Sequence, residues 1–172
     1  GRQVTPIVGW FKVRGTERAA LDLAPESPRF SGPAGPEIAL ARWSVGGISQ
    51  GSLAVSPGQQ VTLELAWSAL RRPAADYTVF VHLVDGQGAI VAQDDVPPGG
   101  SFLPTTTWLP GQVVRSEHEL AVPAGTPDGE YRLVAGLYHR PSNQRLQAVG
   151  QGGEPLGDVL KLATVHLSGV SP

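Results

Sequence analysis

The strongest hydrophobic pattern in the chain lies at residues 77–84, and the rest of the sequence is organised around it. This segment is β-branched and aromatic and is apolar on both faces. One face carries Val79, Val81 and Leu83, and the other carries Phe80 and Val84. Such a strand is expected to lie within a sheet and to be covered on both sides. The turn signal at 85–88 then predicts a hairpin that returns through a strand at 89–93.

The segment 60–68 shows the cleanest period of two. Val61, Leu63, Leu65 and Trp67 alternate with smaller or polar residues, which predicts a half-buried antiparallel strand. Further strands are predicted at residues 38–45, 49–55, 113–122, 130–139, 145–149 and 158–167. Turn residues separate these segments, and none has a convincing helical period. The pattern predicts an all-β fold, an antiparallel β-sandwich that is immunoglobulin/fibronectin-like or jelly-roll-like.

The first part of the chain is the least regular. We predict an N-terminal arm and linker over residues 1–36 and a β-sandwich domain over residues 37–169. Prolines at 25, 28, 33 and 36 mark the linker. The arm, residues 1–15, is apolar and strand-prone, and it could add as a strand to a neighbouring copy of the chain. The residues expected to make that contact are Val4, Ile7, Val8, Trp10, Phe11 and Val13.

Composition narrows the classes of partner. The chain has 172 residues, enough for one domain with an extension. Its net charge of −2 and pI near 6.1 give no electrostatic case for binding nucleic acid or an anionic membrane. It has no cysteine, which excludes disulfides and thiolate metal sites. It has no methionine either, so we expect a processed or excised chain. No stretch approaches the roughly 18 apolar residues of a membrane span.

Four oxygen-bearing side chains bracket the central hairpin. Asp85, Gln87, Asp94 and Asp95 could together hold Ca²⁺, because calcium prefers oxygen ligands from turns and strand ends. The ordinary alternative is that Asp85 starts the turn through its side-chain acceptor and that Asp94 or Asp95 ties down the next loop. We favour this alternative and expect no resident cofactor.

Few residues suggest catalysis. Glu117 and Glu119 are two residues apart on a strand, so they share a face, and paired carboxylates can act as acid and base at a glycosidic bond. Arg115 lies on the same face, and a solvated strand face is the explanation that we favour for all three residues. His82 lies on the buried strand and is expected to be a hydrogen-bonded core histidine. The other histidines, expected at the surface, are His118, His139 and His166. The chain has no G-x-S-x-G elbow and no P-loop. We therefore expect no enzymatic activity, with a glycoside-active enzyme as the remaining alternative.

Exposed aromatic side chains could provide a stacking platform for sugar rings. Trp10 and Trp108 flank Pro or Gly loops, so they are the tryptophans expected to be exposed. Tyr138 is the third candidate for ligand binding. Packing in the core is the alternative explanation for each of them, and we favour it.

Several short motifs follow one another in a distinctive order and spacing. They are Val61-Thr62-Leu63-Glu64-Leu65-Ala66-Trp67, Asp76-Tyr77-Thr78-Val79-Phe80-Val81-His82-Leu83, Asp85-Gly86-Gln87-Gly88, Thr105-Thr106-Thr107-Trp108 and Pro127-Asp128-Gly129-Glu130-Tyr131-Arg132-Leu133. With them, residues 37–167 resemble a bacterial, Chloroflexi-type extracytoplasmic β-sandwich module. Such modules are appended to multi-span membrane proteins that resemble dolichyl-phosphate-mannose-type glycosyltransferases. Residues 1–36 have no counterpart in this resemblance.

The resemblance implies a location outside the cytoplasmic membrane and brings no catalytic motif. We therefore expect a non-catalytic module for interaction or assembly that binds glycan or protein, the latter being a second copy or a parent membrane protein. The alternative is a structural subunit of a surface filament or oligomer that uses residues 1–15 as an intermolecular strand. In neither case do we expect nucleic-acid binding or membrane insertion of this segment.

Overall fold

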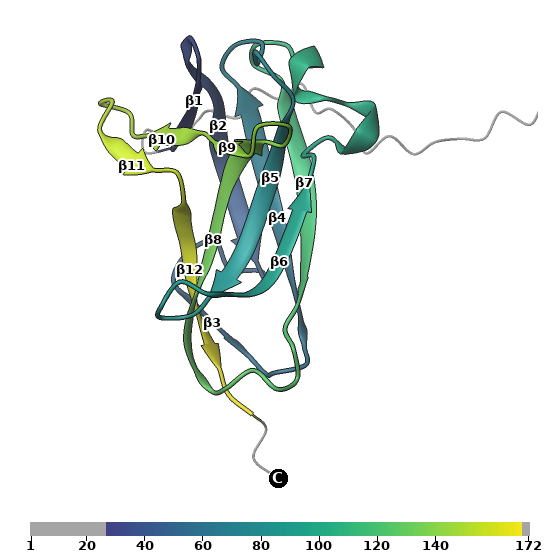
Figure 1. Ribbon diagram of the computed structural model, residues 1–172, viewed down its shortest axis with the longest axis vertical. Helices are drawn as coiled ribbons and strands as arrows, with labels where there is room; N and C mark the ends of the chain where they lie inside the picture. Colours follow the sequence, from purple (N-terminus) through teal and green to yellow (C-terminus); the bar gives the residue numbers. More distant parts are fainter. Residues whose placement is uncertain (1–26, 170–172) are drawn as a thin grey trace, which may run out of the picture.

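The computed structural model describes residues 27–169, which form two six-stranded sheets packed face to face (Figure 1). The predicted all-β sandwich is confirmed. The first sheet has the order β11-β10-β1-β2-β4-β7, and the second has the order β3-β12-β8-β5-β6, with β9 paired to β8. The strands are β1 (Arg29–Gly32), β2 (Gly35–Val45), β3 (Ser52–Val55), β4 (Gln60–Ala69), β5 (Tyr77–Val84), β6 (Ile90–Val96), β7 (Val113–Ala121), β8 (Gly129–His139), β9 (Gln144–Arg145), β10 (Gln147–Val149), β11 (Pro155–Gly157) and β12 (Leu160–Leu167).

Over the described residues, helical structure is confined to the segment between β6 and β7. It consists of two single turns of 3₁₀ helix, η1 (Gly100–Phe102) and η2 (Thr105–Thr107). Within residues 27–169, no helix has the length and apolar character needed to cross a membrane. Almost all strand pairs are antiparallel, but β3 and β12 run parallel to each other.

The sandwich begins earlier than the sequence predicts. Arg29–Gly32 is a strand that pairs with β2 on one side and β10 on the other, and Phe30 is fully buried. The predicted boundary between linker and sandwich, at residue 36, therefore lies too far along the chain, because β1 already belongs to the sandwich. The prolines at 33 and 36 bound a tight β1–β2 hairpin, in which Gly35 has a φ of 99°. Residues 1–15, including the predicted assembly arm, lie outside the described residues.

The core follows the predicted alternation of β4 and β5. The inward residues Val61, Leu63, Leu65 and Trp67 of β4 are buried against Val79, Val81 and Leu83 of β5. Burying a side chain of this size stabilises the folded state by roughly 1.5–3 kcal/mol. All eight residues of β5 are buried, which confirms that this strand is covered on both faces.

The predicted strand at 145–149 divides between the two sheets. Gln144–Arg145 pairs with β8 in the second sheet, whereas Gln147–Val149 pairs with β1 in the first. Leu146 lies at the crossing and is buried, so the chain passes through the edge of the core at this residue. The segment therefore brings Arg145 beside β8, where it contributes to the site described below.

A buried carboxylate fixes the end of the sandwich at which β4 joins β5. Glu37 is 1% exposed, and its Oε2 accepts hydrogen bonds from the Tyr77 hydroxyl at 3.0 Å and from the Ala74 backbone N–H at 3.0 Å. Burial raises the pKa of Tyr77 well above its ordinary value, and the hydrogen bond and charge of Glu37 raise it further. This contact ties β2 to the loop before β5.

Candidate functional site

The outer face of the second sheet is hollowed over β5. Strand alternation turns Phe80, His82 and Val84 away from the core, toward this face. With Val134 of β8 they form the floor of a hollow of about 190 Å³, which we call the outer hollow. These four residues are at most 8% exposed. The floor is apolar and aromatic apart from one imidazole.

Phe80 occupies the middle of that floor. Its ring centroid lies 4.9 Å from that of His82 and 6.3 Å from that of Tyr138. The ring lies above Gly136 of β8, where an added Cβ would overlap the ring and the Asp158 backbone oxygen. Gly136 therefore makes room for the aromatic floor.

Longer side chains form the edge of the outer hollow. The Arg145 guanidinium carbon lies 4.5 Å from the centroid of the Phe80 ring, a cation–π contact. Arg132 donates from Nη2 to the Asp85 backbone oxygen at 3.3 Å. Ile90 of β6 also lines the hollow and is 49% exposed. The edge thus combines two guanidinium groups with one accessible aliphatic side chain.

One hydrogen bond lies beside the floor. His82 Nε2 is 3.0 Å from Asp95 Oδ1, across the β5–β6 pair. The prediction of a buried, hydrogen-bonded His82 is confirmed. The imidazole is oriented by this carboxylate, so its position in the floor is fixed.

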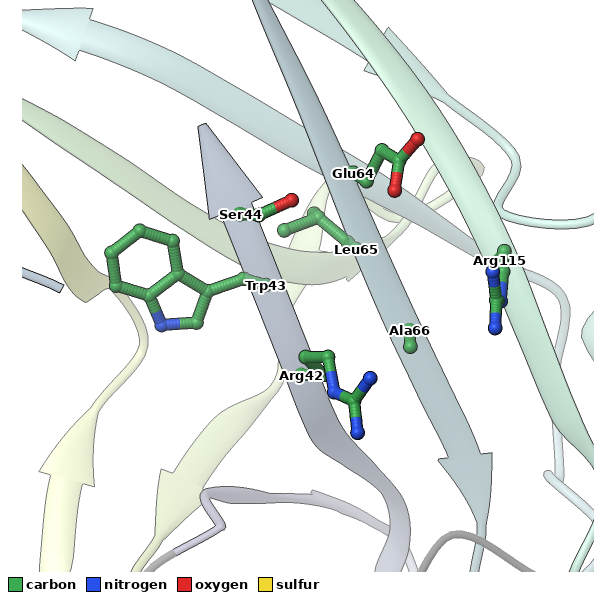
Figure 2. A pocket seen from close by; sticks show the side chains of 7 residues that line it. All are labelled: Arg42, Trp43, Ser44, Glu64, Leu65, Ala66 and Arg115. Atoms are coloured by element: carbon green, nitrogen blue, oxygen red, sulfur yellow. The ribbon is translucent and has the colours of Figure 1, made fainter. Parts of the chain in front are cut away.

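A second, smaller hollow of about 70 Å³ lies on the outer face of the first sheet (Figure 2). The strand register places Arg42 of β2 and Arg115 of β7 on either side of Ala66 in β4. Glu64 lines the same hollow. Trp43 also lines this hollow, and its partly buried side chain packs against the core as well. Of the two, the outer hollow has the larger volume and the chemistry of a ligand site.

The residues proposed for calcium do not come together. Asp85 Oδ1 accepts the backbone N–H groups of Gln87 at 2.9 Å and Ala89 at 2.8 Å, so it organises the turn. Asp94 and Asp95 are neighbours on β6 and point to opposite faces, toward His118 and His82 respectively. In the described part of the chain, no group of three or more acidic, histidine or cysteine side chains could hold a metal. The alternative that we favoured, turn and loop fixing, describes Asp85 correctly.

The three aromatic residues predicted to bind a ligand have different positions in the structure. Trp108 is fully buried and donates from Nε1 to the Leu103 backbone oxygen at 3.2 Å, so its candidacy as an exposed ligand-binding residue is wrong and the favoured core packing describes it. The 3₁₀ turns fold this loop back onto the core, which proline and glycine signals alone did not indicate. Trp10 lies outside the described residues. Tyr138 is half-buried next to Phe80, close to the outer hollow.

A buried hydrogen-bonded chain joins the two sheets at the β6–β7 side. Trp67 Nε1 donates to Ser116 Oγ at 3.1 Å, and Ser116 Oγ lies 2.9 Å from His118 Nε2. His118 Nδ1 in turn is 3.2 Å from Asp94 Oδ2, although it lacks the alignment of a hydrogen bond. The order of groups is that of a Ser-His-Asp triad. Ser116 is only 4% exposed and His118 is 0% exposed, so the hydroxyl faces the closed core and this geometry supports a structural role.

The surface position predicted for His118 is therefore wrong. Alternation along β7 turns it inward with Ser116, while Glu117 and Glu119 are exposed on the outer face, as predicted. Burial lowers the pKa of His118 below its ordinary value, and this effect outweighs the nearby Asp94 carboxylate, which acts in the opposite direction. Glu119 accepts a hydrogen bond from Gln60 Nε2 at 2.7 Å.

Sequence comparisons assign no family. No protein-family model matches the chain, and no curated protein matches it. Among solved structures, the chain is similar to the C-terminal domain of Wzt, with 13% identity over 94% of this chain and 91% of that chain and a TM-score of 0.51. It is also similar to a Niemann-Pick type C2 protein from Japanese carpenter ant, with 9% identity over 86% of this chain and 97% of that chain and a TM-score of 0.37. The likeness to the Wzt domain shows a β-sandwich fold that distantly resembles it.

Proposed function

We propose that this protein is a non-catalytic, glycan-binding module that works outside the cytoplasmic membrane, and that the outer hollow is its ligand site. The observation that carries the proposal is the pairing, in one hollow, of an aromatic and aliphatic floor with a hydrogen-bonding edge. The extracytoplasmic location rests on the resemblance of residues 37–167 to exported sandwich modules.

The chemistry of a sugar matches this arrangement. A pyranose ring presents C–H groups on its faces and hydroxyl groups around its rim. The faces pack on exposed apolar side chains such as Ile90, while Phe80, which is 1% exposed, supports the floor from beneath Arg145. The hydroxyl groups accept hydrogen bonds from guanidinium donors such as those of Arg132 and Arg145.

The size of the hollow limits the ligand. Sites for drug-sized ligands usually span roughly 300–1,000 Å³. The outer hollow, at about 190 Å³, is smaller and suits one sugar unit, such as the end of a chain or a protruding branch. Weak, reversible binding is expected, because one unit buries little surface.

A glycan array followed by calorimetric titration tests the proposal. The informative variant is Ile90→Asp, because Ile90 is an exposed hydrophobic residue at the hollow. Leu109→Asp is the matched control, since Leu109 is 60% exposed and lies away from the hollow. We expect Ile90→Asp to weaken sugar binding by about tenfold or more and Leu109→Asp to leave it unchanged. Binding to no sugar, or equal binding by both variants, would refute the proposed site.

A further inference from the structure

We infer that the sugar unit bound in the outer hollow carries a negative charge, as uronic acids do. This inference rests on the proposed function and adds a ligand class to it. Among the described residues that line the hollow, Arg132 and Arg145 carry positive charge and none is a carboxylate. An apolar floor with a cationic edge selects for a ligand that offers both a hydrophobic face and an anion.

The carboxylates nearby leave this cationic edge largely uncompensated. Asp95 is engaged by His82 at 3.0 Å. Asp158 Oδ2 is 3.9 Å from Arg145 Nη1, and both side chains are more than a third exposed, so this pair is loose and worth little. Arg132 makes its hydrogen bond to a backbone carbonyl, which satisfies one donor without neutralising the charge. Lys161 adds a further positive charge, because it pairs with Val134 on the same outer face.

The stacking of Arg145 prepares it to bind an anion. Its guanidinium carbon lies over the Phe80 ring, 4.5 Å from the ring centroid. A guanidinium has five N–H donors, so Arg145 in this cation–π contact can still offer a donor pair to a carboxylate. The stacking also limits the side-chain entropy that binding would cost.

The hollow on the first sheet provides an internal comparison. It also has two arginines, Arg42 and Arg115, but Glu64 lines it together with them. Both signs of charge therefore meet in that hollow, and its small volume of about 70 Å³ leaves less room for a sugar. An anionic sugar is expected to prefer the outer hollow, and Arg42 supplies a control position.

The test uses the full chain and pairs of oligosaccharides that differ only in charge. Oligomers of galacturonate, hyaluronan and alginate are titrated beside their neutral, carboxyl-reduced counterparts. We expect at least one acidic oligomer to bind about tenfold tighter than its neutral counterpart, because hydrogen bonds to charged groups are the strong ones. We expect Arg132→Gln to remove most of that difference, and Arg42→Gln to leave it in place.

The outcomes separate the two proposals. If a neutral oligomer binds as tightly as its acidic counterpart in an Ile90-dependent way, or if Arg42→Gln and Arg132→Gln have equal effects, the inferred charge is wrong and the glycan site stands. If no oligosaccharide binds at all, the proposed function itself fails. Circular dichroism of each variant confirms that a loss of binding does not come from unfolding.

Discussion

Acid should destabilise this sandwich through the buried histidine His118. In the unfolded chain His118 has its ordinary pKa of 6.5, and in the folded protein burial lowers that pKa despite the opposing effect of Asp94. Between the two pKa values, the unfolded state holds a proton that the folded state does not. The free energy of unfolding therefore decreases as the pH falls below about 6.5. Above that pH the imidazole is neutral in both states, and His118 adds no pH dependence.

The magnitude follows from proton linkage. A difference of one bound proton changes the free energy of unfolding by about 1.4 kcal/mol for each pH unit. The loss from His118 is therefore at most about 1.4 kcal/mol between pH 6.5 and 5.5, which is a large share of a typical stability of about 5–15 kcal/mol. The loss ends once the pH reaches the lowered pKa of the folded state.

Urea denaturation followed by tryptophan fluorescence, at several pH values between about 5 and 8, measures this effect. His118→Gln should flatten the dependence of the free energy of unfolding on pH, whatever its offset in absolute stability. His166→Gln is the matched control, because His166 is exposed on β12 and should leave the slope unchanged. The reasoning is refuted if His118→Gln keeps the wild-type slope, or if an NMR titration shows His118 taking up its proton above pH 6.5.

Three further perturbations test contacts described above. Gly136→Ala should lower the free energy of unfolding by about 1–3 kcal/mol, because the added Cβ overlaps the Phe80 ring in the floor of the outer hollow. Gly86→Ala places its Cβ in open space and should lower it far less; thermal unfolding measures both. Ser116→Ala leaves the Trp67 indole N–H and the His118 Nε2 buried without this hydroxyl partner. The free energy of unfolding, measured by urea denaturation, should fall by about 1–3 kcal/mol for each of the two groups. Tyr77 should ionise in an ultraviolet titration only well above pH 10.0. The free energy of unfolding should fall as the pH rises above 10.0, because the folded state retains the Tyr77 proton that the unfolded state loses. Glu37→Gln should lower the pKa of Tyr77 in the same titration.

The sequence was sufficient to predict the sandwich where alternation was strict. Residues 60–68 and 77–84 became β4 and β5 with the predicted faces buried, because the period of two leaves one way to hide their apolar residues. It missed β1, a four-residue strand whose stability comes from β2 and β10 rather than from its own composition. Local propensity carries no information about such distant partners.

The candidate site could be predicted only in part, for the same reason. Phe80 and Val84 gave a usable signal, since apolar residues on the second face of β5 require something to cover them. Phe80 is covered by Arg145, which is distant in sequence and reaches Phe80 only after the turn that follows β8. The opposite orientations of Asp94 and Asp95 were readable from strand alternation, and applying it to β6 would have removed the calcium hypothesis.

The two pairings that join distant parts of the chain determine when this protein can fold. β3 needs β12 as its parallel neighbour, and β1 needs β10, so neither sheet is complete until almost all of the described sequence is present. Folds dominated by such long-range contacts form slowly, and their unpaired edges are prone to aggregate in the meantime. A nascent chain that stops before β12 would leave β3 and one edge of β8 without partners. Shortened products of this protein are therefore expected to aggregate or be degraded rather than accumulate as partial domains.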